Sequence, residues 1–349
     1  IPAGGDRTAA ISEAAAAALG IGPAHAVAPS LPGTQTTLRT VRIPEAAARQ
    51  LADVLPFELE SQLPFDLEGA VLDWRVLEGH TNEEGIAVLA AVARVDETQR
   101  RIDLVKAALA LEPERVGTGA FPIANLAPFC TVLSEARTIA ILDLGTKTSD
   151  LVFLEAGEPV FARTLSLGTD GLPQTAPKLA REIRLSLSAF RAQGGKPPDE
   201  IFLCGGGAFV SGAESFLSAE LERPVRRLPP LSIELGEIAS ARAAELPLYA
   251  GAVGLALSLG GNDRGMDLRK GPLAYERGWG WLRERVPVLV GLGAVIAVSV
   301  VFSSCTAVYA ASKDRTTLET ALGDLTKEVF GEEATTAERT NELLAAQSA

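Results

Sequence analysis

The 349-residue sequence is poor in aromatic residues, histidine and cysteine, and each shortage excludes a kind of core, functional site or cross-link. Aromatic residues make up 5% of the chain although hydrophobic residues make up 47%, so alanine, valine and leucine must build most of the core. His25 and His80 have no other histidine or cysteine near them in the sequence, which argues against a metal cluster and a catalytic histidine. The cysteines Cys130, Cys204 and Cys305 are widely spaced and odd in number, which predicts reduced thiols rather than a disulfide framework.

The chain also lacks the excess of positive charge that nucleic-acid binding requires. Its formal net charge is -12 at pH 7, and an acidic surface repels phosphate groups. Nucleic acid is therefore excluded as a partner. Because the sequence begins at Ile1 and stops in the polar stretch 338–349, we expect strands of the first domain before Ile1 and further residues after Ala349.

One segment lacks charge altogether. No charged residue lies between Arg285 and Lys313, which leaves the 27 residues 286–312. As a helix they would be about 40 Å long, whereas the hydrocarbon core of a bilayer, about 30 Å thick, needs about 20 residues. A buried core helix rarely continues so far without a polar face. We therefore predict a single transmembrane helix over residues 286–312.

The residues that flank this helix predict its orientation. More basic residues lie close upstream of it than close downstream, and the positive-inside rule then places the N-terminal side in the cytoplasm. Trp279, Trp281, Arg283 and Arg285 stand where residues that anchor a helix at the membrane surface are expected. The basic residues are Arg269, Lys270, Arg277, Arg283 and Arg285 upstream, and Lys313, Arg315 and Lys327 downstream.

Residues 313–349 follow the membrane segment and contain an apolar stripe. Leu318, Leu322, Leu325 and Val329 recur at spacings of four, three and four residues, which is a heptad-like pattern. The stripe predicts a helix that continues from the membrane. Two alternatives remain: the helix packs on a partner, or it is an amphipathic stalk.

Upstream of the membrane segment, residues 1–260 alternate between strand and helix patterns. Strands in hairpins that alternate with helices are typical of an α/β domain with a mixed sheet. The stretch 261–285, rich in glycine and charge, is predicted to be a linker. Strands are expected at 138–144, 149–155, 158–166 and 200–204, and helices at 173–193, 211–221 and 246–259.

Two polar, glycine-containing turns could bind a nucleotide. In the turn 143–150, a glycine lets backbone N–H groups approach a phosphate, and the hydroxyls and carboxylates can reach its metal or water. In the turn 205–208, three glycines would let a flat ring or sugar lie against the backbone. Neither is a Walker loop or a dinucleotide fingerprint, and the first taken alone is an ordinary polar turn. The candidate residues are Asp143, Gly145, Thr146, Thr148, Asp150, Gly205, Gly206 and Gly207.

The order of these motifs resembles the second half of the actin/hexokinase-like (ribonuclease H-like) ATPase fold. An Asp-x-Gly-x-x-x-Ser/Thr-Asp hairpin is followed by a long helix and by a strand that ends in Gly-Gly-Gly-Ala. The resemblance implies a two-lobed α/β domain in which 143–150 is the second phosphate loop and 205–208 the adenosine loop. A first phosphate loop should lie near the N-terminus, but residues 1–33 contain no such hairpin. Either truncation removed it or this branch never had a working site.

The first half of the sequence is similar to two related bacterial families. Leu-Pro-Gly at 31–33, Val-Arg-Ile-Pro at 41–44, the acidic run 58–68 and Leu-Asp-Trp at 72–74 resemble protein M of type IV pilus assembly and protein L of the type II secretion system. Protein L carries its own membrane helix after the cytoplasmic domain, and residues 266–271 with 286–312 are similar to that arrangement. Protein M is soluble and borrows its anchor from a partner. A natural fusion of protein M with that partner would have the same order of segments in its sequence.

The resemblance to protein L implies an inner-membrane scaffold. Domain 1–260 would lie in the cytoplasm and recruit the secretion ATPase, helix 286–312 would cross the bilayer, and 313–349 would begin a periplasmic stalk. The helices would pair with another bitopic platform protein or with a copy of this chain, as a homodimer or higher oligomer. The expected docking surface for the ATPase contains Glu58, Glu60, Phe65, Asp66 and Glu68.

A pilus platform role and an actin-like ATPase are the alternatives to the secretion scaffold. Catalysis would rest on Asp143 and Asp150 and would also need the absent first loop. Because phosphoryl transfer requires several charges to be positioned at once, half a site should not turn over. We expect no enzyme activity and no obligatory cofactor, although ATP could bind without being hydrolysed.

Overall fold

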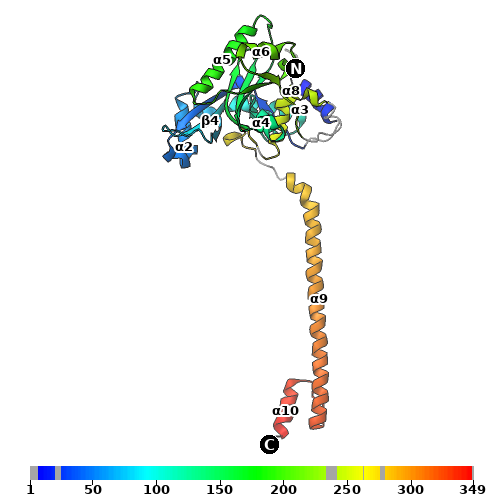
Figure 1. Ribbon diagram of the computed structural model, residues 1–349. Coiled ribbons are helices and arrows are strands. Elements are labelled where there is room, and N and C mark those ends of the chain that lie inside the picture. The colour runs from blue at the N-terminus through cyan, green and yellow to red at the C-terminus, as the bar shows by residue number, and fades with distance from the viewer. Residues whose placement is uncertain (1–6, 20–24, 233–241, 262, 276–279, 348–349) are drawn as a thin grey trace. The chain divides into compact units, whose positions relative to one another are not determined.

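The computed structural model describes residues 7–19, 25–232, 242–261, 263–275 and 280–347 (Figure 1). The chain divides into two compact units. Unit 1 comprises residues 1–275 and holds the sheets, and unit 2 comprises residues 276–349.

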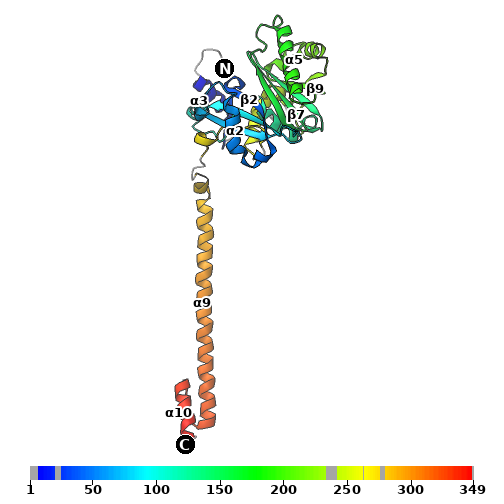
Figure 2. The same ribbon diagram turned by 90° about the vertical axis from the view of Figure 1, so that its left-hand side faces the viewer.

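Unit 1 contains a five-stranded mixed sheet with the order β10-β9-β6-β7-β8, which lies in the right-hand part of the unit in Figure 2. Its elements and helices are β6 (Thr138–Leu144), β7 (Ser149–Glu155), β8 (Glu158–Leu165), α5 (Ala176–Ala192), β9 (Glu200–Cys204), α6 (Ala213–Leu221), β10 (Val225–Arg227) and α8 (Leu246–Ser258). β6 pairs in parallel with β9 and antiparallel with β7. Strands covered on both faces have continuous apolar sequences, and every residue of β9 is buried. The predicted α/β fold with a mixed sheet is confirmed.

A second sheet is antiparallel and three-stranded, with the order β2-β4-β3. Its strands and helices are β2 (Thr36–Ile43), α2 (Leu51–Glu60), β3 (Ala70–Val76), β4 (Ile86–Arg94) and α3 (Val95–Leu109). The central strand β4 is buried on both faces. On one face Val88, Ala90 and Val92 pack beneath α2. On the other face the alternate residues, Leu89 among them, join the main core.

Short elements connect the two sheets. β1 (Ser30–Leu31) pairs in parallel with β5 (Gly117–Thr118), and α1 (Arg7–Leu19) packs on α3. α8 packs against the turn η4 so closely that a Cβ on Gly254 would lie 2.0 Å from the Pro122 carbonyl oxygen. The short helical turns are η1 (Gly33–Gln35), η2 (Glu45–Gln50), η3 (Leu67–Gly69), η4 (Phe121–Phe129), α4 (Thr131–Ser134), η5 (Gly206–Phe209), η6 (Ala243–Glu245) and η7 (Gly271–Leu273).

Residues 263–275 form an ordered segment of unit 1, which we call the strap. The sequence predicted a domain that ends at 260 and a linker over 261–285, whereas the compact unit extends to Tyr275. Met266 and Leu268 are buried in the main core, and the N–H of Leu268 donates to the Val116 carbonyl at 2.8 Å. The boundary moves because the glycine- and charge-rich pattern resembles a linker, although here the charges have partners in the domain.

Unit 2 contains α9 (Gly280–Phe330) and α10 (Ala337–Gln347). By length and composition, residues 285–330 of α9 can cross a membrane: the most apolar 18-residue window has a mean hydropathy of 2.4 and none of it is buried. Of the predicted anchor residues, Trp279 lies outside the described part of the chain, whereas Trp281, Arg283 and Arg285 lie in the first turns of α9.

The chain turns back after α9, so that α10 begins beside the end of α9. Thr326 is buried here: its hydroxyl accepts the N–H of Ala334 at 2.9 Å and donates to the Leu322 carbonyl at 2.9 Å. Of the predicted apolar stripe, Leu318, Leu325 and Val329 are exposed and Leu322 is half-buried, so most of the stripe remains open.

We predict that Thr326→Val opens this turn. Valine keeps the shape but leaves the N–H of Ala334 without its acceptor, which should destabilise the turn by about 1 kcal/mol. Hydrogen exchange at Ala334 should then be about fivefold faster. Thr317→Val is the matched control, because Thr317 is exposed and bonds only to the Lys313 carbonyl of its own helix. Unchanged exchange at Ala334 would contradict the assigned role.

Candidate nucleotide site

Two aspartates face each other at one end of β6 and β7. Asp143 and Asp150 are directly opposed in the antiparallel register, and the turn between them closes with a bond from the Gly145 N–H to the Thr148 carbonyl at 3.1 Å. The sequence predicted that these residues belong to one turn. Within it Thr146 is exposed, whereas Gly145 and Thr148 are half-buried.

The segment that follows β8 closes over this turn. The N–H of Thr169 donates to the Gly145 carbonyl at 2.9 Å, and the N–H of Asp170 donates to the Thr146 carbonyl at 2.8 Å. Gly168 lies so near that a Cβ on it would be 2.4 Å from both carbonyl oxygens. Backbone N–H groups of the same chain therefore satisfy these two carbonyl groups of the turn.

Asp150 is surrounded by residues that are distant in the sequence. Its carboxylate accepts a hydrogen bond from the Thr164 hydroxyl. A Cβ on Gly33 would lie 2.4 Å from Asp150 Oδ1, and a Cβ on Gly119, whose φ is +48°, would lie 3.4 Å from the same atom. Backbone from the β1 and β5 ends thus lies directly against this carboxylate.

Burial raises the pKa of both aspartates. The pKa of Asp143 rises to about 6, mainly through desolvation and secondarily through the nearby charge of Asp150. The pKa of Asp150 is also raised by burial, and the Thr164 hydroxyl opposes this by bonding to the ionised form. Among the described residues, no group of three or more histidine, cysteine and acidic residues is placed to hold a metal ion.

The glycine turn after β9 packs against the end of β6. A Cβ on Gly205, whose φ is +74°, would lie 2.2 Å from Asp143 Oδ1. A Cβ on Gly207 would lie 2.2 Å from the Leu144 side chain, whereas Gly206 has open space. Two of the three predicted glycines are therefore explained by packing within the chain, and only Gly206 leaves room for a ligand.

An apolar cavity of about 260 Å³ lies next to this turn, between α5 and α6. A flat apolar ring could enter it. No lining side chain is charged, so the cavity offers no group that would neutralise a phosphate. Its lining residues are Leu144, Leu172, Pro173, Ala176, Pro177, Leu179, Val210, Ser211, Gly212, Ala213, Phe216 and Leu217.

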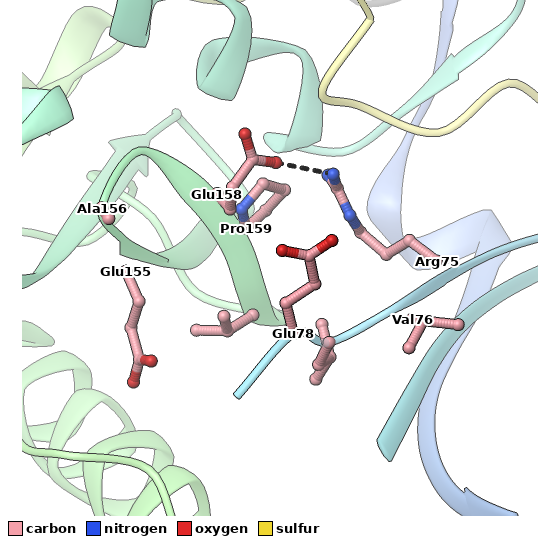
Figure 3. Close-up of a pocket in the computed structure, with 9 residues that line it drawn as sticks. Arg75, Val76, Glu78, Glu155, Ala156, Glu158 and Pro159 are labelled. Carbon is pink, nitrogen blue, oxygen red and sulfur yellow. Dashed lines mark hydrogen bonds and ion pairs between the residues drawn. The ribbon is translucent and has the colours of Figure 1, made fainter. Parts of the chain in front are cut away.

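A larger cavity, of about 510 Å³, lies at the other end of β7, away from the two aspartates (Figure 3). Its carboxylates are mostly paired: Glu158 lies 2.7 Å from the Arg75 guanidinium, and Glu155 lies 2.9 Å from His80 Nε2. Arg75 belongs to β3 and Glu158 to β8, so these pairs join the two sheets. The strap residue Arg264 also reaches Glu158, at 3.1 Å.

The predicted docking surface is only partly available. Glu58, Glu60, Asp66 and Glu68 are exposed, but Phe65 is half-buried and packs on the core beneath α2. The exposed aromatic residue here is Phe57, whose side chain is 75% exposed. The sequence contained a usable signal for this, because Leu51, Leu55 and Leu59 recur at helical spacing and place Phe57 on the other side of α2.

Sequence reasoning missed the residues that come from far along the chain. Gly33, Gly119 and Thr164 complete the surroundings of Asp150. Of these, only Gly33 was noted in the sequence, as part of the Leu-Pro-Gly motif that resembles the pilus and secretion families. No sequence signal pointed to Thr164.

Comparison with known proteins agrees with this fold. Residues 22–177 match the sequence model of the type IV pilus assembly protein PilM family. A chain in the structure of a PilM–PilN type IV pilus biogenesis complex is 24% identical, with a TM-score of 0.59, over 72% of this chain and 85% of that chain. No curated protein sequence matches.

A second solved structure is the cytoplasmic domain of EpsL, an inner membrane component of the type II secretion system of Vibrio cholerae. It is 16% identical, with a TM-score of 0.43, over 76% of this chain and 84% of that chain. A Bacteroides thetaiotaomicron protein with an actin-like ATPase fold is 10% identical, with a TM-score of 0.35, over 62% of this chain and 75% of that chain. The match to the chain of the PilM–PilN complex confirms the actin-like fold that the sequence predicts, and this chain is similar to PilM.

Proposed function

We propose that this PilM-like chain is a membrane-anchored assembly platform of a bacterial type II secretion system. Unit 1 would lie in the cytoplasm, α9 would cross the inner membrane, and the residues after it would enter the periplasm. The observation that carries the proposal is the strap, which shows that the chain is bonded to unit 1 as far as Tyr275, close in sequence to the apolar helix.

The strap is held by charge pairs as well as by apolar contacts. Asp73 of β3 accepts the N–H of Asp267 at 2.7 Å and pairs with Lys270. At the other sheet, Arg264 pairs with Glu158 of β8 at 3.1 Å, and its carbonyl accepts a hydrogen bond from Arg75. Because the strap bonds to both sheets, a force applied through the adjoining residues would reach the whole domain. A scaffold that relays motion needs such an attachment.

The surroundings of the aspartate pair favour a scaffold over an enzyme. Thr164, Gly33 and Gly119 occupy the space around Asp150, and Asp143 fills the space beside Gly205. The residues present therefore do not fit a complete magnesium–nucleotide site, and we derive no catalytic step from them. The expected partners are a cytoplasmic secretion ATPase, a second bitopic platform protein and the lipid bilayer.

A pilus platform is the second candidate, and the family match favours it. Residues 22–177 match the pilus protein PilM, and the structural match with the higher TM-score is a chain of a PilM–PilN complex. On this reading the spanning helix, carried on the same chain, would take the place of a separate membrane partner.

A binding experiment with the full chain in lipid nanodiscs tests both candidates. Purified ATPases of the secretion type and of the pilus type, from the same cell, are each titrated onto the chain. We expect the secretion ATPase to bind. Binding of the pilus ATPase alone would move the assignment to the second candidate, and binding of neither would overturn the platform proposal.

Two further measurements test the scaffold role and the orientation. Hydrolysis of ATP by the chain alone, abolished by Asp143→Ala, would contradict a scaffold without enzyme activity. Protease added to sealed inverted membrane vesicles should digest unit 1 and leave α10 protected. The opposite pattern would reverse the proposed topology.

A further inference from the structure

The outer side of α2 carries an exposed aromatic residue between two carboxylates. Leu51, Leu55 and Leu59 face the core, so residues 53, 57 and 60 lie on the opposite side of the helix. Phe57 is 75% exposed, and Asp53 and Glu60 flank it one turn away on either side. We call Asp53, Phe57 and Glu60, with their surroundings, the α2 surface.

The α2 surface is strongly acidic. Between residues 45 and 68 six exposed carboxylates accompany a single basic residue, Arg49. Within the described part of the chain, none of the six takes part in an ion pair of this structure. The carboxylates are Glu45, Asp53, Glu58, Glu60, Asp66 and Glu68. An exposed aromatic side chain among carboxylates is suited to contact an apolar residue that is surrounded by basic residues.

The outer side of α5 has the complementary character. Leu185 is 45% exposed, and Arg181 and Lys178 lie one and two turns before it on the same side of the helix. Arg191 is also exposed. Arg184 differs from these, because it pairs with Glu220 at 2.9 Å. We call Lys178, Arg181 and Leu185 the α5 surface. Glu182 lies on the same side and pairs with Arg163 at 3.5 Å, whereas Arg191 lies about a third of a turn away round the helix.

We propose that the α2 surface of one copy of this chain binds the α5 surface of a second copy. Phe57 would contact Leu185, with Glu60 and Asp53 beside the basic residues of α5. Within one copy α2 and α5 lie at separate places on unit 1, so the two surfaces do not cover each other (Figures 1 and 2). The contact is reciprocal in a two-fold pair, or it repeats along a row of copies. It goes beyond the platform proposal, and it assigns to a second copy a surface that the sequence predicted to bind the ATPase.

Cysteine cross-linking between two differently tagged copies of the full chain tests the contact. Ser61→Cys and Ser188→Cys place a thiol beside each surface while Phe57 and Leu185 stay in place, and both serines are exposed. The exposed Cys305 is changed to serine in both, whereas Cys130 and Cys204 are buried. We expect a mixed disulfide when the two variants are combined. The control replaces Ser61→Cys with Ser134→Cys, an exposed serine on α4.

Charge reversal separates this contact from simple proximity in the membrane. Glu60→Lys in the Ser61→Cys copy should lower the mixed product by about tenfold, since it faces basic residues with a new positive charge. Arg181→Glu in the other copy should restore it. Glu245→Lys, at an exposed site on η6, should change nothing. Equal cross-linking with Ser134→Cys, or a loss that Arg181→Glu does not rescue, would overturn the proposal.

Discussion

Replacing Asp73 with alanine is expected to free the strap and to destabilise unit 1 by about 3 kcal/mol. Asp73 is 7% exposed and accepts the N–H groups of Trp74 at 2.8 Å and Asp267 at 2.7 Å, besides pairing with Lys270. Alanine leaves two backbone donors without this acceptor in a region that water scarcely reaches. Hydrogen exchange should therefore accelerate over residues 266–270 before it does in β4, and chemical denaturation gives the loss of free energy.

Asp73→Asn is the matched control for this change. Asparagine keeps one oxygen, which can accept from Asp267. It loses the oxygen that accepts from Trp74 and the charge that attracts Lys270, whose side chain is 49% exposed. One lost hydrogen bond costs about 1 kcal/mol and an exposed ion pair contributes little, so the loss should be about 1.5 kcal/mol, half of that expected for alanine. Equal effects of the two substitutions would show that the hydrogen bond to Asp267, which asparagine keeps, does not hold the strap. Exchange that accelerates uniformly over unit 1 would contradict a separately held strap.

Asp143→Asn is expected to stabilise unit 1 by about 3 kcal/mol at pH 7. The pKa of Asp143 is raised on folding, from 3.8 to about 6, by burial and by Asp150. A raised pKa means that the folded chain holds this proton more tightly, so ionisation opposes folding. The penalty is absent below about pH 3.8, grows between 3.8 and 6, and is complete at neutral pH. Asparagine never ionises and escapes it.

Thermal unfolding at several pH values measures this effect. The midpoint of Asp143→Asn should exceed that of the unchanged chain at pH 7, and the two should converge near pH 4. Asp66→Asn, at an exposed site, should alter the unfolding free energy by less than about 0.5 kcal/mol. Destabilisation by Asp143→Asn at pH 7 would instead mean that the ionised carboxylate is stabilised by a bound cation, which would reopen the nucleotide-binding alternative.

Much of the central sheet could be predicted because its strands are covered on both faces. Continuous apolar runs follow from that burial, and β6, β7 and β9 have the predicted bounds. The strap could not be predicted in the same way. Its glycines and charges read as a solvated linker, and only the three-dimensional fold supplies the partners, such as Asp73 for Lys270 and Glu112 for Arg269.

The candidate site likewise has one part that the sequence predicts and one part that it does not. Asp143 and Asp150 are neighbours across a tight hairpin, so their proximity is a local property of the sequence. Gly33, Gly119 and Thr164 meet Asp150 only after β1, β5 and β8 have been brought together, and nothing in their local sequences specifies that contact. For this reason the nucleotide-like motif was visible and its crowded surroundings were not.

By itself the sequence determined the long apolar helix and the turn between the aspartates, because each depends on residues that are close along the chain. The tertiary structure alone decided that the strap is bonded to both sheets, and that Phe65 packs on the core beneath α2. It also decided that Gly205 and Gly207 serve packing. These outcomes depend on which distant surfaces meet, and therefore on side-chain burial and pairing that no local pattern contains.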